Sequence, residues 1–138
     1  MLTASPKQIA LIDASLPDWQ TLAASLPAGT DIETFTSLAQ LGQWARSHTG
    51  EYAALHLFSH GASGRLQLGA DTLDQASLSL PAIQAQLHTL GQALTPDGDL
   101  LLYGCDVAEG RSGLEFISEL AQATLADIAA STNLTGTH

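Results

Sequence analysis

Leu55-His56-Leu57-Phe58-Ser59-His60-Gly61 is an apolar run that ends in a His-Gly pair, and Leu100-Leu101-Leu102-Tyr103-Gly104-Cys105 is a second run that ends in Gly-Cys. Both runs have the length and composition of strands buried inside a sheet. The carboxyl ends of parallel strands open on one edge of their sheet. We therefore expect His60 and Cys105 to lie side by side at that edge, and Leu101 to belong to the buried core.

The remaining chain alternates between further apolar runs and helical patterns. Strands are expected at Ile9–Asp13, Thr30–Phe35, Tyr52–Ser59, Asp99–Tyr103 and Ala126–Ala130. Helices are expected after a cap at Asp18, after a cap at Ser37 as far as Gly50, from Pro81 to Leu94, and from Ser112 or Gly113 onward. Gly64–Gly69 is expected to form a hairpin arm and Thr95–Gly98 a turn.

This alternation of strands and helices predicts a single α/β domain over residues 1–138, which we expect to be a piece of a larger protein. The predicted architecture is a three-layer sandwich around a mostly parallel five-stranded sheet, in the order 2-1-3-4-5 with right-handed crossovers.

The charge of the chain limits its partners. Fourteen acidic and four basic residues give a formal net charge of −10, whereas nucleic-acid binding needs clustered Lys and Arg. Anionic membrane surfaces are disfavoured for the same reason, and no apolar run has the roughly 18 residues that span a bilayer. We expect neither nucleic-acid binding nor membrane insertion.

Cys105 is the only cysteine, so it is either a buried small hydrophobe or a working thiol. An imidazole beside a thiol favours the thiolate and carries its proton, which makes the sulfur a nucleophile. Backbone N–H groups around Gly104 and Cys105, together with that of Gly61, would form an oxyanion hole. The alternative for His60 is a histidine that caps its strand and bonds a nearby carbonyl group.

His56 lies within its strand, four residues before His60, and is expected to be hydrogen-bonded in the core or against a helix. A zinc site of His56, His60 and Cys105 is conceivable because residues i and i+4 of a strand share a face. The separation of about 13 Å along the strand argues against it. We therefore expect neither a metal ion nor another cofactor.

The His-Gly and Gly-Cys pairs, each at the end of an apolar strand, resemble the signature of the caspase, gingipain and legumain superfamily of cysteine peptidases. In addition, the chain resembles an uncharacterised domain near the N-terminus of very large bacterial surface and adhesin-like proteins. That second resemblance covers nearly all of the chain and includes Leu66–Gly69, Leu102–Ala108 and Ala129–Gly136.

The superfamily resemblance implies a caspase-like fold, with Cys105 as the nucleophile and His60 as the general base and acid. It also implies that Asp13, Arg65 and Asp106 line the pocket for the substrate residue before the cleaved bond. A carboxylate at Asp13 would favour a basic substrate residue, whereas Arg65 would bind a substrate carboxylate. The alternatives are that Asp13 caps a turn and that Arg65 is a solvated side chain.

Two features of the sequence depart from the caspase pattern. Asp106 stands beside the thiol and would raise its pKa. Cys105 also lacks the Gln-Ala-Cys-x-Gly surroundings of caspases, so aspartate specificity does not carry over.

The sequence supports two hypotheses of different classes. The first is a cysteine endopeptidase module of a large exported bacterial protein, with polypeptide substrates that include its own parent chain. The second is a non-catalytic module that serves assembly or adhesion. Either would be secreted or held at the cell surface through an export signal outside this chain, and neither fixes an oligomeric state.

Overall fold

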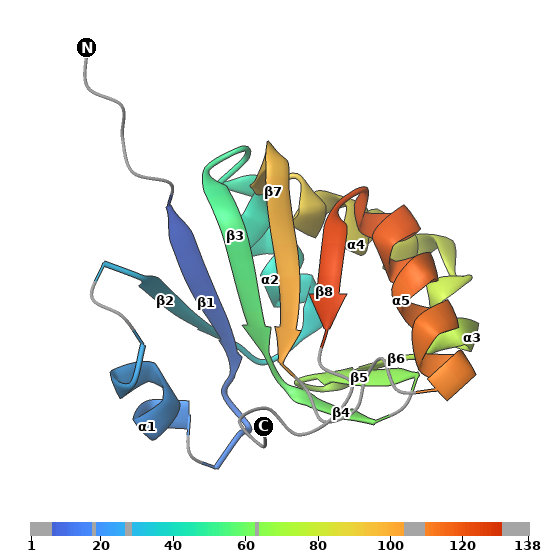
Figure 1. Cartoon of the computed structure of the whole chain (residues 1–138), viewed down its shortest axis with the longest axis horizontal. Helices are drawn as coiled ribbons and strands as arrows, with labels where there is room; N and C mark the ends of the chain where they lie inside the picture. The colour runs from blue at the N-terminus through green and yellow to red at the C-terminus, as the bar shows by residue number, and fades with distance from the viewer. Residues whose placement is uncertain (1–6, 18, 27–28, 63, 104–109, 131–138) are drawn as a thin grey trace.

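A computed structural model describes residues 7–17, 19–26, 29–62, 64–103 and 110–130. The chain is α/β, with a mostly parallel central sheet flanked by helices, consistent with a three-layer sandwich (Figure 1). The strands of the central sheet are β1 (Gln8–Asp13), β2 (Asp31–Phe35), β3 (Tyr52–Phe58), β7 (Leu94–Tyr103) and β8 (Asp127–Ala130). Their order is β2-β1-β3-β7-β8, and each pair of neighbours runs parallel.

A second sheet of three antiparallel strands lies beyond the carboxyl ends of the central strands (Figure 1). Its strands are β4 (His60–Ala62), β5 (Arg65–Leu68) and β6 (Asp71–Leu73). The described chain thus has eight strands rather than five, and β7 and β8 hold the fourth and fifth places of the predicted order. The sequence indicated only the hairpin arm around β5, because strands of three residues are too short for apolar alternation to show.

The helices are α1 (Trp19–Ala24), α2 (Leu38–Arg46), α3 (Gln75–Leu78), α4 (Pro81–Gly91) and α5 (Gly110–Thr124). α2 contacts α4 and α4 contacts α5, so these three helices form one layer against the sheet (Figure 1). α1 contacts β1 instead. Because the chain moves from β1 to β2 in one direction and from β3 to β8 in the other, right-handed crossovers put α1 on the opposite face.

The core lies between the central sheet and the α2–α4–α5 layer. Leu57 of β3 and Leu102 of β7 are buried in one cluster with Phe116 and Leu120 of α5. The prediction that Leu101 belongs to this core was wrong, since its side chain is only partly buried. Successive side chains of a strand point to opposite faces, so Leu101 points away from the side on which Leu102 meets the helices.

Helix ends differ from the predictions by a few residues. The cap at Ser37 is confirmed, since its side chain accepts a hydrogen bond from the Gln40 N–H at 3.2 Å. α2 ends at Arg46 rather than near Gly50, and α4 ends at Gly91 rather than Leu94. The predicted cap at Asp18 lies outside the described residues.

Two local features between the predicted elements were missed. Thr95–Gly98 is part of β7, where the pairing with β3 shifts from Tyr52–Leu94 to Ala54–Asp99 and the strand bulges instead of turning. α3 is a single turn of helix whose Asp74 side chain accepts from the Ser77 N–H at 2.9 Å. The spacing of this capping box was a signal that could have located the helix.

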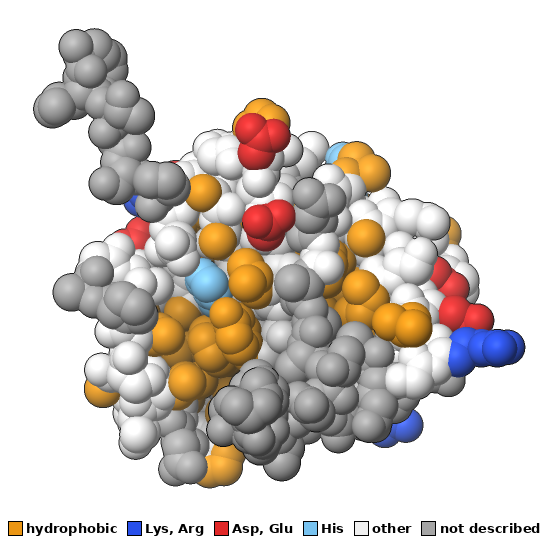
Figure 2. Space-filling model, viewed as in Figure 1, with side chains coloured by type: hydrophobic (Ala, Val, Ile, Leu, Met, Phe, Trp, Pro, Cys, Tyr) orange, Lys and Arg blue, Asp and Glu red, His pale blue; other side chains and the backbone are white. Residues whose placement is uncertain are grey.

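The face of the central sheet opposite the α2–α4–α5 layer is the one seen in Figure 2. Hydrophobic side chains gather there over β1 and β3, and a second group gathers over β8 and α5. Phe58 and Tyr103 stack on this face, with ring centroids 4.4 Å apart, and both are only partly buried. This face of the sheet therefore presents partly exposed aromatic side chains at the ends of β3 and β7.

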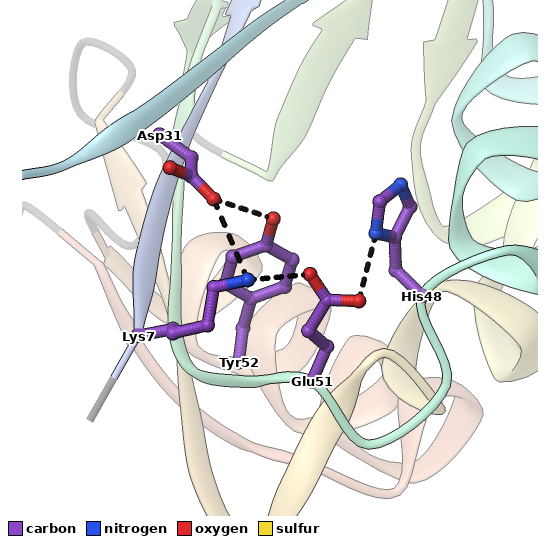
Figure 3. A network of polar contacts seen from close by, with 5 residues as sticks. All are labelled: Lys7, Asp31, His48, Glu51 and Tyr52. Atoms are coloured by element: carbon purple, nitrogen blue, oxygen red, sulfur yellow. Dashed lines mark hydrogen bonds and ion pairs between the residues drawn. The ribbon is translucent and has the colours of Figure 1, made fainter. Parts of the chain in front are cut away.

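Five side chains form a polar cluster at the amino-terminal ends of β1, β2 and β3 (Figure 3). Lys7 Nζ lies 2.7 Å from Glu51 Oε2 and 3.9 Å from Asp31 Oδ2. The Tyr52 hydroxyl donates to Asp31 Oδ2 at 2.8 Å, and His48 Nδ1 lies 3.0 Å from Glu51 Oε1. The cluster ties the start of β1 to its two neighbouring strands.

Glu51 should make folding stability depend on acid pH. The hydrogen bond from Lys7, and then that from His48, lower the pKa of Glu51 to about 2. A carboxyl group with a lowered pKa stabilises the fold above its unfolded pKa of about 4.5, and this contribution disappears as the pH falls to about 2. We expect Glu51→Gln to lose less stability than the native chain over that interval, as measured by urea denaturation.

The matched control is Glu33→Gln, which changes an exposed glutamate of β2 outside the cluster. This variant should keep the native pH dependence. Equal slopes for the native chain and Glu51→Gln would contradict the assignment.

Candidate functional site

His60 follows the carboxyl end of β3 by two residues and is the first residue of β4. Its side chain is exposed, and it pairs with Gln67 of β5 in the second sheet. Phe58 and Tyr103 are register partners at the ends of β3 and β7. The Ser59 N–H donates to the Tyr103 carbonyl oxygen at 3.4 Å. The end of β7 therefore lies beside the residue that precedes His60.

Gly104, Cys105 and Asp106 lie outside the described residues, so their roles as oxyanion donor, nucleophile and pocket residue stay predictions.

Asp13 ends β1 at the same carboxyl edge and is completely buried, with 0% of its surface exposed. Its Oδ1 accepts from the N–H and the hydroxyl of Ser15, at 2.9 and 2.8 Å. Its Oδ2 accepts from the Gly69 N–H at 2.9 Å. Because both carboxylate oxygens are engaged inside the fold, the geometry favours the turn-capping alternative over a place in a substrate pocket.

The turn between β5 and β6 is docked against the central sheet. Gly69 has a φ of +61°, and a Cβ there would lie 2.1 Å from the Thr36 carbonyl oxygen, so only glycine fits. The Ala70 N–H donates to that same oxygen at 2.9 Å. Asp71 Oδ2 accepts from the Leu38 N–H at the start of α2, at 2.8 Å. Together with Asp13, these contacts hold the second sheet across the carboxyl edge.

Arg65 is the first residue of β5, and its pairing partner is Ala62 of β4. The arginine side chain is exposed. This exposure agrees with the solvated alternative and also leaves the guanidinium accessible from outside. Gly61 contributes its backbone to β4.

His56 is hydrogen-bonded, as expected. Its Nε2 lies 2.7 Å from Gln8 Oε1 and its Nδ1 lies 2.9 Å from the Tyr103 hydroxyl. Because the Gln8 oxygen only accepts, Nε2 carries the proton and Nδ1 accepts from Tyr103. Burial lowers the pKa of His56 and raises that of Tyr103, which favours the neutral forms of both. Both ring nitrogens of His56 are therefore occupied by hydrogen bonds to residues of the central sheet.

Metal-ligating side chains do not cluster in the part of the chain that the structure describes. No group of three or more His, Cys, Asp and Glu residues there could hold a metal ion. Cys105 falls outside that part of the chain.

Two surface hollows lie on the helix layer rather than at the carboxyl edge. One, of about 530 Å³, lies between α2 and α4, and the other, of about 760 Å³, lies among α3, α4 and α5. Both are lined mainly by glutamine, serine, threonine and alanine, and neither includes His60, Asp13 or Arg65. The predicted site is thus distinct from these hollows.

The chain belongs to the family described as Domain of unknown function (DUF4347), whose family model matches residues 9–138. No curated protein and no solved structure matches the chain. Across the described residues, every helix is too short or too polar to cross a membrane.

Replacing the buried carboxylate should loosen the join between the two sheets. In Asp13→Asn, an amide NH₂ takes the place of one acceptor oxygen and faces an N–H or hydroxyl donor. We expect a loss of about 1–3 kcal/mol in the free energy of unfolding, as measured by urea denaturation.

The control is Asp97→Asn, at an exposed position of β7, which should unfold like the native chain. If Asp13→Asn were as stable as the control, the carboxylate would not be the anchor of the second sheet. Its burial would then need another explanation.

Proposed function

We propose that this chain is a cysteine endopeptidase module on a caspase-like fold, with Cys105 as the nucleophile and His60 as the general base and acid. The parallel pairing of β3 with β7, in register at Phe58 and Tyr103, supports this proposal most strongly. His60 and Cys105 each follow that pair by two residues. The strands that precede His60 and Cys105 in the sequence thus end side by side.

The topology of the central sheet adds support. The strand order reverses between β1 and β3, and ligands of open α/β sheets bind outside the carboxyl ends at such a reversal. His60 follows β3 at this point. Its exposure leaves the imidazole accessible to a substrate.

The chemistry requires a proton acceptor, a nucleophile and a site for developing negative charge. His60 would take the proton from Cys105 Sγ, and the thiolate would attack the carbonyl carbon of the scissile peptide bond. Backbone N–H groups at Gly61 and Gly104 would stabilise the oxyanion. The imidazolium would then protonate the departing amine, and water would release the acyl group from the sulfur.

The substrate is a polypeptide, and we include the parent chain of this module among its targets. Arg65 is accessible to a substrate carboxylate, and Asp106 completes the proposed pocket. We place the module in a large exported bacterial protein, in line with its resemblance to domains of surface and adhesin-like proteins.

One observation favours a second candidate function, a non-catalytic module for assembly or adhesion. The superfamily resemblance implies that Asp13 lines the substrate pocket. Both of its carboxylate oxygens, however, accept hydrogen bonds from groups inside the fold. A domain that keeps this fold without a specificity pocket would serve as an interaction module.

Alkylation of the thiol distinguishes these two functions. Iodoacetamide near neutral pH should modify Cys105 faster than free cysteine, because a neighbouring imidazole favours the thiolate. His60→Ala should slow the modification to the rate of free cysteine. His88→Ala, which removes an exposed histidine of α4, should leave the rate unchanged.

The rate is followed by intact mass spectrometry of the folded chain. If Cys105 reacted at the rate of free cysteine in the native chain and in both variants, the proposed catalytic mechanism would be wrong. The non-catalytic function would then be the better account.

A further inference from the structure

The central sheet has two edge strands, β2 and β8. Natural sheets guard exposed edge strands with charged side chains. β2 forms one edge and carries the exposed residues Asp31 and Glu33. β8 forms the other edge with the sequence Asp-Ile-Ala-Ala, and among the described residues no strand pairs with its outer side. Within the described part of the chain, β8 is thus an edge strand whose outer side has no neighbouring strand.

α5 contacts β8 and presents an apolar stripe on its surface. Leu114 is 63% exposed and Leu125 is 73% exposed, and the partly buried Ile117 and Ala121 lie between them. These positions recur at the spacing of one helix face. Figure 2 shows hydrophobic side chains gathered where α5 and β8 lie in Figure 1.

Acidic side chains of α5 are held on a different flank of the helix. Glu115 and Glu119 both accept from the Gln75 side-chain amide of α3, each at 3.2 Å. The apolar stripe is thus free of their carboxylates. We call the outer edge of β8 together with this stripe the edge surface.

Leu125 has an unfavourable backbone conformation and an unfavourably exposed side chain. It follows the last residue of α5 with a φ of +58°, in the left-handed region where helices usually place glycine or asparagine. Its side chain also exposes more of its surface than any other large hydrophobic residue described as exposed. Strain of this kind points to a role outside folding.

We propose that the edge surface binds an extended segment of another polypeptide, which adds to the sheet as a strand beside β8. The outward-facing N–H and C=O groups of β8 would pair with the segment backbone, and alternate apolar side chains of the segment would contact Leu114 and Leu125.

Charge indicates what flanks the apolar part of that segment. Asp97 and Asp99 are exposed on β7, and Asp99 is the register partner of Asp127 at the start of β8. A basic residue at that end of the segment would meet these acids. Because the chain carries a net charge of −10, a second copy would bring like charges together, and a basic-flanked partner fits better.

The probe for this proposal is a short synthetic peptide of alternating valine and threonine with a lysine at each end. Its binding to the whole chain is measured by fluorescence anisotropy. We expect saturable binding, which is lost when every second peptide nitrogen is methylated, because methylation removes the backbone donors. Replacing the terminal lysines with glutamates should also weaken binding.

Two variants change the edge surface and one matched variant does not. Leu114→Glu should weaken peptide binding at least about tenfold. Leu125→Gly should do the same while folding at least as stably as the native chain, since glycine relieves the left-handed strain. Leu80→Glu changes another exposed leucine, 52% exposed and located before α4, and should bind the peptide like the native chain.

The proposal is overturned if the peptide does not bind, if the methylated peptide binds equally well, or if Leu80→Glu weakens binding as much as Leu114→Glu. A dimer in sedimentation that Leu114→Glu dissociates would also overturn it, because the occupant would then be a second copy. The edge surface does not include His60, so none of these results depends on the proposed peptidase activity.

Discussion

The backbone pairing between β3 and β7 is the interaction on which the rest of the structure depends. It joins the half of the sheet built from β2, β1 and β3 to the half built from β7 and β8. It also fixes the register that turns Leu57 and Leu102 towards the helix layer. A slip of one residue would move these leucines to the other face and empty the core. The same register sets the ends of β3 and β7, at Phe58 and Tyr103, side by side.

A buried carboxylate provides the second constraint. Without Asp13, the turn between β5 and β6 would lose a charge-assisted hydrogen bond from Gly69, which is about twice as strong as a neutral one. The second sheet adds Leu66, Leu68 and Leu73 to the common core. The second sheet is thus a structural part of the carboxyl edge. Because His60 belongs to β4, its position depends on the second sheet as well as on β3.

The order of strands and helices was predictable because each long element carries its own periodicity and punctuation. Ser37 is a good example, since an N-cap acts within one turn of helix and needs no tertiary contact. The position of Leu101 was not predictable, because a run of three leucines has no alternation to show which faces the helices. The anchoring role of Asp13 depends on Gly69, a residue far away in the sequence. Local patterns therefore could not decide whether Asp13 lines a substrate pocket or caps a turn.

The candidate site was predictable to the same extent as the strands that carry it. The neighbouring positions of β3 and β7 followed from two apolar runs, whereas β4 did not, because its pairing with β5 is a contact between short segments. The edge position of β8, in contrast, followed from the predicted strand order, in which the last strand is the outermost one.

The central claim is that the pairing of β3 with β7 brings His60 and Cys105 together, and a disulfide tests it most directly. His60→Cys creates a second thiol, and Cα atoms about 4.4–6.8 Å apart can be bridged. Under mild oxidation, thiol titration and intact mass should show an intramolecular disulfide in most His60→Cys molecules and free thiols in the control His88→Cys. Free thiols in both variants would contradict the claim.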